Sequence, residues 1–273
     1  MTVLLVANGV SHAYRRQSVL SDISMAVSGG EFVSIIGPNG SGKSTLLRCF
    51  GRVLRPNGGT VTLADKDVWS TSPREFARRV AFVPQGPTAP QDLIVEELVW
   101  RGRFPHRGLF GRTAADDQQA VERAIEIADI SALRNRAIGT LSGGERQRAF
   151  IAMSLAQTPE LLLLDEPTTF LDIAHQLDLL ELLSRLNREQ GLTVIMVMHD
   201  VGQAAMFSRR LIAIREGVIV ADGSPRDVVT TERLNAIFGA ALRVMDDPET
   251  GVPLVLPVLP ETKEGVADGH DSR

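Results

Sequence analysis

The octapeptide Gly37-Pro-Asn-Gly-Ser-Gly-Lys-Ser44 is the most informative stretch of this sequence. It fits the pattern G-x-x-x-x-G-K-[ST] and lies between the apolar run FVSIIG at 32–37 and a helical pattern that begins near Lys43. In this context the glycines let backbone N–H groups face phosphate oxygens, Lys43 reaches the β- and γ-phosphates, and the Ser44 hydroxyl ligates Mg²⁺. The candidate phosphate-binding residues are Gly37, Pro38, Asn39, Gly40, Ser41, Gly42, Lys43, Ser44 and Thr45.

Three further apolar runs resemble the one before this loop. They are VAFVPQ at 80–85, LLLLDE at 161–166 and TVIMVMHD at 193–200. Unbroken runs of this length are typical of strands buried on both faces of a parallel sheet. Amphipathic patterns between them, such as the leucines at 179, 182, 183 and 186, predict helices with one apolar stripe. The sequence therefore predicts an α/β fold with a mostly parallel sheet.

Other segments depart from this pattern. The opening residues and TVTLAD at 60–65 alternate in polarity, which favours a small antiparallel β-subdomain. The stretch from about 86 to 157 has helical patterns and no convincing strand, so we expect a helical subdomain inserted into the α/β core. Residues 261–273 are polar and are predicted to be disordered.

Two adjacent acids follow the apolar run at 161–164. Ligands bind at the carboxyl edge of such a sheet, where Asp165 is suited to hold Mg²⁺ and Glu166 to orient or deprotonate an attacking water. Taken alone, such a pair is usually only a solvated strand end. Beside a phosphate-binding loop, catalysis is the better interpretation.

The composition excludes several classes of function. The 29 basic and 33 acidic residues give a net charge of −4, so nucleic acid is not an expected partner. The single cysteine, Cys49, excludes an internal disulfide and is expected to be a small buried residue. No apolar run approaches the roughly 18 residues of a membrane span, and the first residues lack the features of a signal peptide.

The segment Leu141-Ser-Gly-Gly-Glu-Arg-Gln-Arg148 allows a family to be recognised. It resembles the LSGGQ signature of ABC ATPases, with Glu145 in place of the commoner glutamine. Ser142, Gly143 and Gly144 open a predicted helix that runs to about Gln157, which leaves hydroxyl and N–H groups for an anion. The resemblance implies that this second anion site is completed by another copy of the chain.

Four further residues match positions of the family, and each also has an ordinary structural explanation. Gln85 resembles the Q-loop glutamine that touches Mg²⁺ and the attacking water; its structural explanation is a turn. His199 resembles the switch histidine at the γ-phosphate; its structural explanation is a strand end. Asp172 resembles the D-loop acid that connects the two sites across the dimer; its structural explanation is a helix N-cap. Tyr14 lies where the family stacks an aromatic ring on adenine; its structural explanation is an ordinary strand aromatic.

The resemblance, which covers roughly residues 3–257, implies a P-loop NTPase (RecA-like) core. It implies one ABC ATPase domain at 1–260, with the core and β-subdomain at about 1–85 and 158–245 and the helical subdomain at about 86–157. It implies ATP and Mg²⁺ as cofactors, a second copy in an ATP-sandwich dimer, and separate transmembrane permease subunits as partners. It also implies that this chain is a peripheral protein at the cytoplasmic face of the cell membrane. A substrate-binding protein is an indirect partner.

Three segments resemble the iron-siderophore and metal-chelate importer ATPases within the family. They are Arg101–His106, Leu171–Gln176 and Asp247–Pro257. We therefore expect an importer of an iron-siderophore complex. The alternatives are a haem or cobalamin importer and, in a different class, a soluble ABC ATPase without a transport role. His106 and His175 are expected to be surface or interface residues, and not metal ligands.

Overall fold

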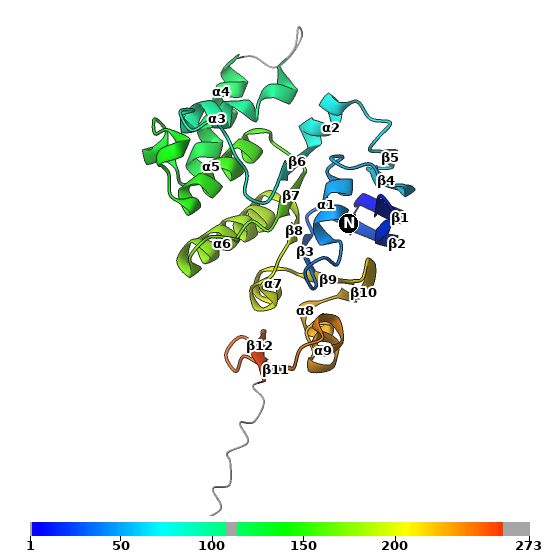
Figure 1. Cartoon of the computed structure of the whole chain (residues 1–273). Coiled ribbons are helices and arrows are strands. Elements are labelled where there is room, and N and C mark those ends of the chain that lie inside the picture. The colour runs from blue at the N-terminus through cyan, green and yellow to red at the C-terminus, as the bar shows by residue number, and fades with distance from the viewer. Residues whose placement is uncertain (1, 108–113, 259–273) are drawn as a thin grey trace, which may run out of the picture.

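The computed structural model describes residues 2–107 and 114–258, and a six-stranded sheet forms its centre (Figure 1). The strand order is β10–β9–β3–β8–β7–β6, and every pair is parallel except β10 with β9. The strands are β3 (Phe32–Ile36), β6 (Val80–Val83), β7 (Leu161–Asp165), β8 (Thr193–Val197), β9 (Arg210–Arg215) and β10 (Val218–Gly223). All four strands predicted from apolar runs are present, and the predicted α/β fold with a mostly parallel sheet is confirmed.

The unbroken apolar runs are explained by burial on both faces of this sheet. Every residue of β3, β7 and β8 is buried. Because side chains alternate along a strand, Leu161 and Leu163 join one apolar core while Leu162 and Leu164 join the other. The first core lies against α1 (Lys43–Phe50), and the second against α6 (Ile173–Gln190) and α7 (Val201–Phe207).

A four-stranded antiparallel sheet packs beside α1, as the alternating segments predicted (Figure 1). Its order is β2–β1–β4–β5, and the strands are β1 (Val3–Tyr14), β2 (Gln17–Ser28), β4 (Gly58–Leu63) and β5 (Lys66–Asp67). Cys49 points from α1 into the same core, where it is fully buried. Burial raises the pKa of its thiol to about 12, so the expectation of a buried apolar residue holds.

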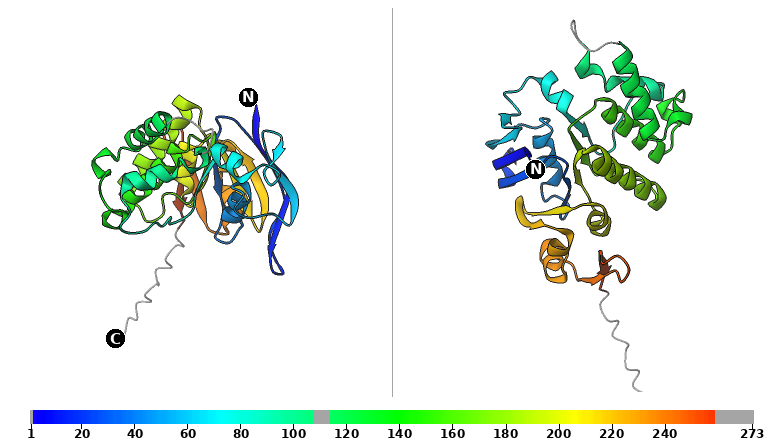
Figure 2. Two further views of the ribbon diagram at one scale, coloured as in Figure 1. Left: turned by 90° about the horizontal axis from the view of Figure 1, so that it is seen from above. Right: turned by 180° about the vertical axis from the view of Figure 1, so that it is seen from behind.

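The described residues between β6 and β7 form helices after α2 (Pro73–Arg79) has led into β6. They are α3 (Val95–Arg101), η1 (Phe104–His106), α4 (Ala114–Ile127), η2 (Ser131–Leu133), η3 (Ile138–Thr140) and α5 (Gly143–Ala156). Figure 2 shows these helices gathered on one side of the sheet. Within 86–107 and 114–157 the extended pairing is limited to one isolated bridge between Ile94 and Ala137.

The C-terminal part adds two helices and a hairpin that the sequence did not reveal. They are α8 (Pro225–Val228), α9 (Thr231–Phe238), β11 (Leu242–Asp246) and β12 (Pro253–Pro257). The tail at 261–273 lies outside the described residues. Among the residues that the structure describes, none of the helices combines the length and apolar character that a bilayer-spanning segment needs.

Candidate functional site

The loop between β3 and α1 has a backbone that only glycine can adopt at two points. Gly37 has φ +145°, and a Cβ there would lie 2.0 Å from the carbonyl oxygen of Ile214. Gly42 has φ +104°, and its Cβ would lie 2.7 Å from the carbonyl oxygen of Val19. The loop therefore packs closely against the backbone of its neighbours at these two points, and its conformation requires glycine at both.

Lys43 lies at the first turn of α1, with its side chain folded back over the loop. Its Nζ donates to the carbonyl oxygens of Gly37 and Pro38, both at 2.9 Å. Burial lowers the pKa of this ammonium group, while the charges of Glu166 and Asp165 act in the opposite direction. A group held in this way can exchange its carbonyl partners for phosphate oxygens with little rearrangement.

Asp165 ends β7 directly beside Ser44. The Ser44 hydroxyl donates to Oδ1 of Asp165 at 2.7 Å, and a guanidinium nitrogen of Arg48 lies 3.7 Å from Oδ2. Desolvation raises the pKa of the Asp165 carboxyl, and the Ser44 bond and Arg48 partly offset this. Oδ2 is buried and has no hydrogen-bond partner within the described residues. A buried carboxylate oxygen with unused acceptor capacity is suited to a cation or its hydration shell.

Glu166 turns back toward the same place because its backbone is left-handed, with φ +53°. Successive strand residues would face opposite sides of the sheet, and this turn brings both acids to one site. A conformation of this kind costs of order 1–3 kcal/mol in a residue other than glycine and is typical of functional sites.

Both oxygens of the Glu166 carboxylate have partners predicted from the sequence. Gln85 donates from Nε2 to Oε2, and Nε2 of His199 lies 2.6 Å from Oε1. A carboxylate only accepts hydrogen bonds, so His199 carries its proton on Nε2 in this contact. The three proposed catalytic side chains, which follow three adjacent strands of the sheet, therefore meet at one point.

A cavity of about 330 Å³ opens between the loop, β1 and Glu166. Of the residues predicted to bind nucleotide, it is lined by Tyr14, Asn39, Gly40, Gly42, Lys43, Ser44 and Thr45. Pro38 and Ser41 face a separate depression on the other side of the loop, beside α9. Gln17 and Val19 also line the cavity and were missed. Gln17 pairs with Tyr14 across a two-residue hairpin turn, but the turn sequence Arg15-Arg16 lacks the residues that usually reveal such a hairpin.

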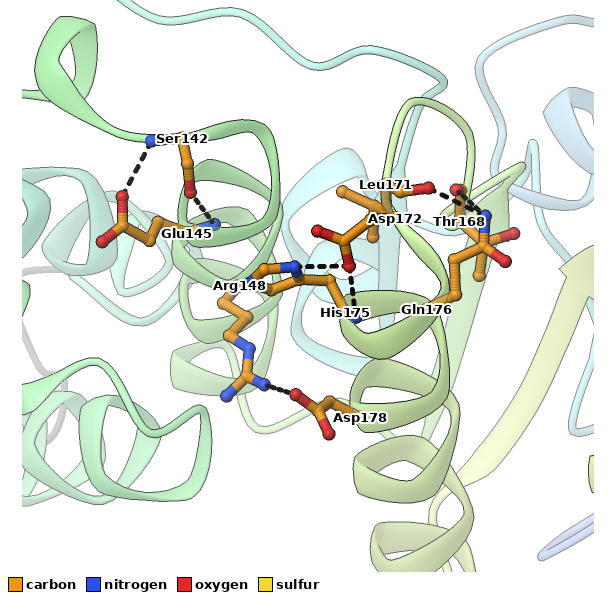
Figure 3. A network of polar contacts seen from close by, with 9 residues as sticks. All are labelled: Ser142, Glu145, Arg148, Thr168, Leu171, Asp172, His175, Gln176 and Asp178. Carbon is orange, nitrogen blue, oxygen red and sulfur yellow. Dashed lines mark hydrogen bonds and ion pairs between the residues drawn. The ribbon is translucent and has the colours of Figure 1, made fainter.

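The signature segment lies elsewhere, at the start of α5 (Figure 3). Ser142 caps the helix: its hydroxyl accepts from the N–H of Glu145 at 3.2 Å, and the Glu145 carboxylate accepts from the N–H of Ser142 at 2.8 Å. None of the residues from Ser142 to Gly144 lines the cavity at the phosphate-binding loop. The predicted second anion site is therefore separate from the cavity at the chain's own phosphate-binding loop.

The Asp172 carboxylate lies beside this helix start through its contact with His175. It accepts from the backbone N–H of His175 at 2.9 Å and from Nδ1 of the same residue at 2.8 Å. The His175 ring packs against Gly144, where a Cβ would lie 2.8 Å from the ring. Further along both helices, an ion pair between Arg148 of α5 and Asp178 of α6, with a nitrogen–oxygen distance of 2.9 Å, joins α5 to α6.

Comparison with known proteins shows to which family the chain belongs. Residues 20–169, more than half of the chain, match the family described as ABC transporter. The chain belongs to this family. The resemblance seen in the signature segment and the predicted class of activity, ATP hydrolysis, are thereby confirmed.

Two relatives within the ABC transporter family extend over almost the whole chain. The ferric enterobactin transport ATP-binding protein FepC of Escherichia coli (strain K12) is 48% identical over 245 residues, which cover 90% of this chain and 90% of the relative. The hemin import ATP-binding protein HmuV of Rhodopseudomonas palustris (strain BisB5) is 41% identical over 267 residues, which cover 95% of this chain and 99% of the relative.

Solved structures of ABC transporter proteins share the fold. A chain of an ABC transporter in an inward-facing conformation has a TM-score of 0.82 and 26% identity, and the match covers 94% of this chain and 98% of that one. A dimeric ATP-binding cassette in a post-hydrolysis state, bound to ADP and Pi, has a TM-score of 0.72 and 28% identity, covering 81% of this chain and 98% of that one.

One expectation about the histidines of this ABC protein was wrong. His106 is buried, because its ring inserts under the end of α5, where Nε2 lies 2.9 Å from the carbonyl oxygen of Gln157. His175 is partly exposed, as expected. No group of three or more His, Cys, Asp or Glu side chains suited to a metal ion occurs in residues 2–107 and 114–258.

Proposed function

We propose that this chain is the ATP-hydrolysing subunit of an importer and that it energises uptake of an iron-siderophore complex through a separate permease. The observation that carries the catalytic part is the Glu166 carboxylate, which lies beside the phosphate-binding loop with Gln85 and His199 on its two oxygens. The cargo rests on the relatives, among which the 48% identical protein is named for ferric enterobactin transport.

ATP would bind with its phosphates over Lys43 and its adenine at Tyr14, which is 45% exposed at the edge of the cavity. Mg²⁺ would be held by Ser44, Asp165 and Gln85, since all three offer the oxygen ligands that this ion prefers. The bound ion would supply charge neutralisation at the phosphates.

The chain's own residues would then activate water. Glu166 would orient the attacking water or accept a proton from it, because the left-handed backbone at this residue places the carboxylate at the wall of the cavity. His199 and Gln85 hold this carboxylate from opposite oxygens, so a change at either contact reorients the base.

Replacement of Glu166 by glutamine tests this assignment. Glu166→Gln should leave ATP affinity nearly intact while turnover falls roughly 10²–10⁴-fold, the effect expected when a general base is removed. ATP binding by calorimetry and phosphate release measure the two quantities. Near-normal hydrolysis would remove Glu166 from the mechanism.

The second anion site supports a dimer of two copies. Each ATP would lie between the phosphate-binding loop of one copy and residues Ser142, Gly143 and Gly144 of the other, with Asp172 connecting the two sites. Glu166→Gln retains ATP, so this variant should dimerise when ATP and Mg²⁺ are added. A monomer on size exclusion under these conditions, with and without permease, contradicts the arrangement.

The division of the chain and its attachment to the membrane are parts of the same proposal. One ABC ATPase domain spans 1–260, with a helical subdomain at about 86–157 that docks a permease at the cytoplasmic face of the membrane. Leu98 and Val99 fill the interior of the helices, whereas Glu97 and Phe104 are exposed and available for docking. Phe104→Asp should abolish stimulation of hydrolysis by the permease and leave the basal rate unchanged. Retained stimulation excludes a role for this position in docking.

A haem importer is the second candidate, because a relative named for hemin import is 41% identical over nearly its whole length. Cells that lack this subunit should lose uptake of an iron-loaded siderophore, delivered by its substrate-binding protein, and retain uptake of haem and cobalamin. Normal siderophore uptake with a defect in one of the others transfers the assignment to that cargo.

A further inference from the structure

The segment Arg101–His106, which the catalytic site does not use, is tied to the last turn of α5. The Arg103 guanidinium is fully buried, where it donates to the carbonyl oxygen of Ala156 at 2.6 Å and pairs with Asp117 of α4 at 2.7 Å. Nε2 of His106 donates to the next carbonyl oxygen, that of Gln157, at 2.9 Å. The segment thus satisfies two of the carbonyl groups that a helix leaves free at its end.

The close approach of this segment to α5 depends on Gly102. A Cβ at this position would lie 2.1 Å from the carbonyl oxygen of Met153, inside α5. Any side chain would push the segment away from the helix and break the contacts of Arg103 and His106. The three residues therefore form one unit.

The same unit is also hydrogen-bonded to α2 and to the start of β6. We call the place where the end of α5 meets α2 and β6 the junction. The carbonyl oxygen of Pro105 accepts from Nε of Arg74 at 2.9 Å and from Nε of Arg78 at 2.8 Å. The Gln157 side chain donates to the carbonyl oxygens of Ala77 and Val80, the latter at 2.7 Å. The end of α5 is consequently fixed to the beginning of β6.

Three functional residues are connected to this junction along the chain. β6 leads to Gln85, residues 157–160 lead into β7 and so to Glu166, and α5 leads back to Ser142. With 14 residues, α5 is about 21 Å long. A tilt of about 5° at the junction therefore moves the Ser142 end by about 2 Å.

We propose that Arg103, His106 and Gln157 form a positioning clamp that sets the angle of α5 relative to β6 and β7, so that Ser142–Gly144 meets ATP held by a second copy. This inference rests on the dimer of the proposed function. The residues touch no reacting atom, and they act through the helix that carries the signature segment. A misplacement of about 1 Å can reduce turnover about 10²-fold, so the leverage along α5 is large enough to matter.

The clamp predicts a division between binding and turnover in the full-length protein. His106→Ala and Gln157→Ala should keep the Kd of one copy for ATP within about twofold, because the phosphate-binding loop is untouched, and should lower kcat about tenfold or more. His106→Gln, whose amide can donate to the same carbonyl, should restore most of kcat. Gln118→Ala is the matched control, because this glutamine is exposed and, among the described residues, its side chain donates to Glu122 of the same helix and to no residue of the clamp.

A second measurement separates this proposal from failure of the dimer itself. In the Glu166→Gln background, His106→Ala and Gln157→Ala should raise the ATP concentration needed for dimerisation, with thermal unfolding measured to confirm that each variant is folded. If Glu166→Gln dimerises with ATP and both clamp variants leave dimerisation and kcat unchanged, the clamp is refuted and the dimer stands. Equal losses in Gln118→Ala, or no recovery in His106→Gln, also overturn it. If Glu166→Gln itself stays monomeric, both proposals fail.

Discussion

Replacement of Gly144 by alanine tests how closely α5 and α6 are packed at the signature segment. A Cβ at 144 would lie 2.8 Å from Cδ2 and 3.0 Å from Cγ of His175. The ring cannot simply rotate away, because its Nδ1 is bonded to Asp172 at 2.8 Å. Gly144→Ala therefore forces either overlap with the ring or loss of this hydrogen bond.

The size of the effect follows from these alternatives. Overpacking of this kind costs about 1–3 kcal/mol, and loss of a hydrogen bond costs about 0.5–1.5 kcal/mol. Alanine recovers at most about 1 kcal/mol through its higher helix propensity. Because the less costly alternative is adopted and alanine recovers part of it, we expect the free energy of unfolding to fall by up to about 1.5 kcal/mol. Gly143→Ala is the matched control, because the nearest atom to its Cβ is the carbonyl oxygen of Phe170 at an ordinary 3.5 Å.

The assay is urea unfolding without nucleotide, combined with a double-mutant cycle. In a His175→Ala background the ring is gone, so Gly144→Ala should cost little or become stabilising. The same loss with and without the ring refutes the steric explanation. A loss of similar size in Gly143→Ala indicates a general effect of side chains at the helix start.

Three further changes separate binding, capping and charge. Lys43→Ala should weaken ATP binding about tenfold to a hundredfold, the equivalent of about 1.5–3 kcal/mol for hydrogen bonds to a charged group, and calorimetry would distinguish it from Glu166→Gln. Ser142→Ala removes the helix cap and should lower the free energy of unfolding by about 1 kcal/mol, whereas Ser142→Thr should retain most of it. Burial raises the pKa of the Asp165 carboxyl in the folded chain above its usual 3.8. The folded chain therefore binds this proton more tightly than the unfolded chain does. The resulting contribution to the free energy of unfolding is complete below the pKa of the unfolded chain and is lost as the pH rises through the raised pKa of the folded chain. Asp165→Asn should remove this loss and raise the melting temperature at neutral pH while hydrolysis disappears; an unchanged pH profile would contradict it.

The central strands could be predicted because their sequence carries the cause of their burial. LLLL at 161–164 has no polar residue for either face, so only a strand covered on both sides suits it. The hairpin of β11 and β12 could not be predicted in this way. Its second strand begins and ends with proline, at 253 and 257, which usually argues against a strand.

The site was predictable where a motif specifies backbone shape and chemistry together, as in the phosphate-binding loop. The contact between Arg48 and Asp165 was not, because the two residues are far apart in sequence and neither position signals the other. The burial of His106 was missed for a related reason. Its partner is a backbone carbonyl, and any residue type at position 157 would supply that atom.

The buried thiol of Cys49 makes this chain convenient for measuring its own motions. Burial raises the pKa of this thiol to about 12, so the reactive thiolate is scarce at neutral pH, and the side chain is closed to solvent. It is also the one cysteine in the sequence. A cysteine introduced at the exposed start of α5 and another on β1 would therefore be the sole targets of maleimide dyes, and distances between them could be followed by fluorescence transfer in the otherwise natural chain.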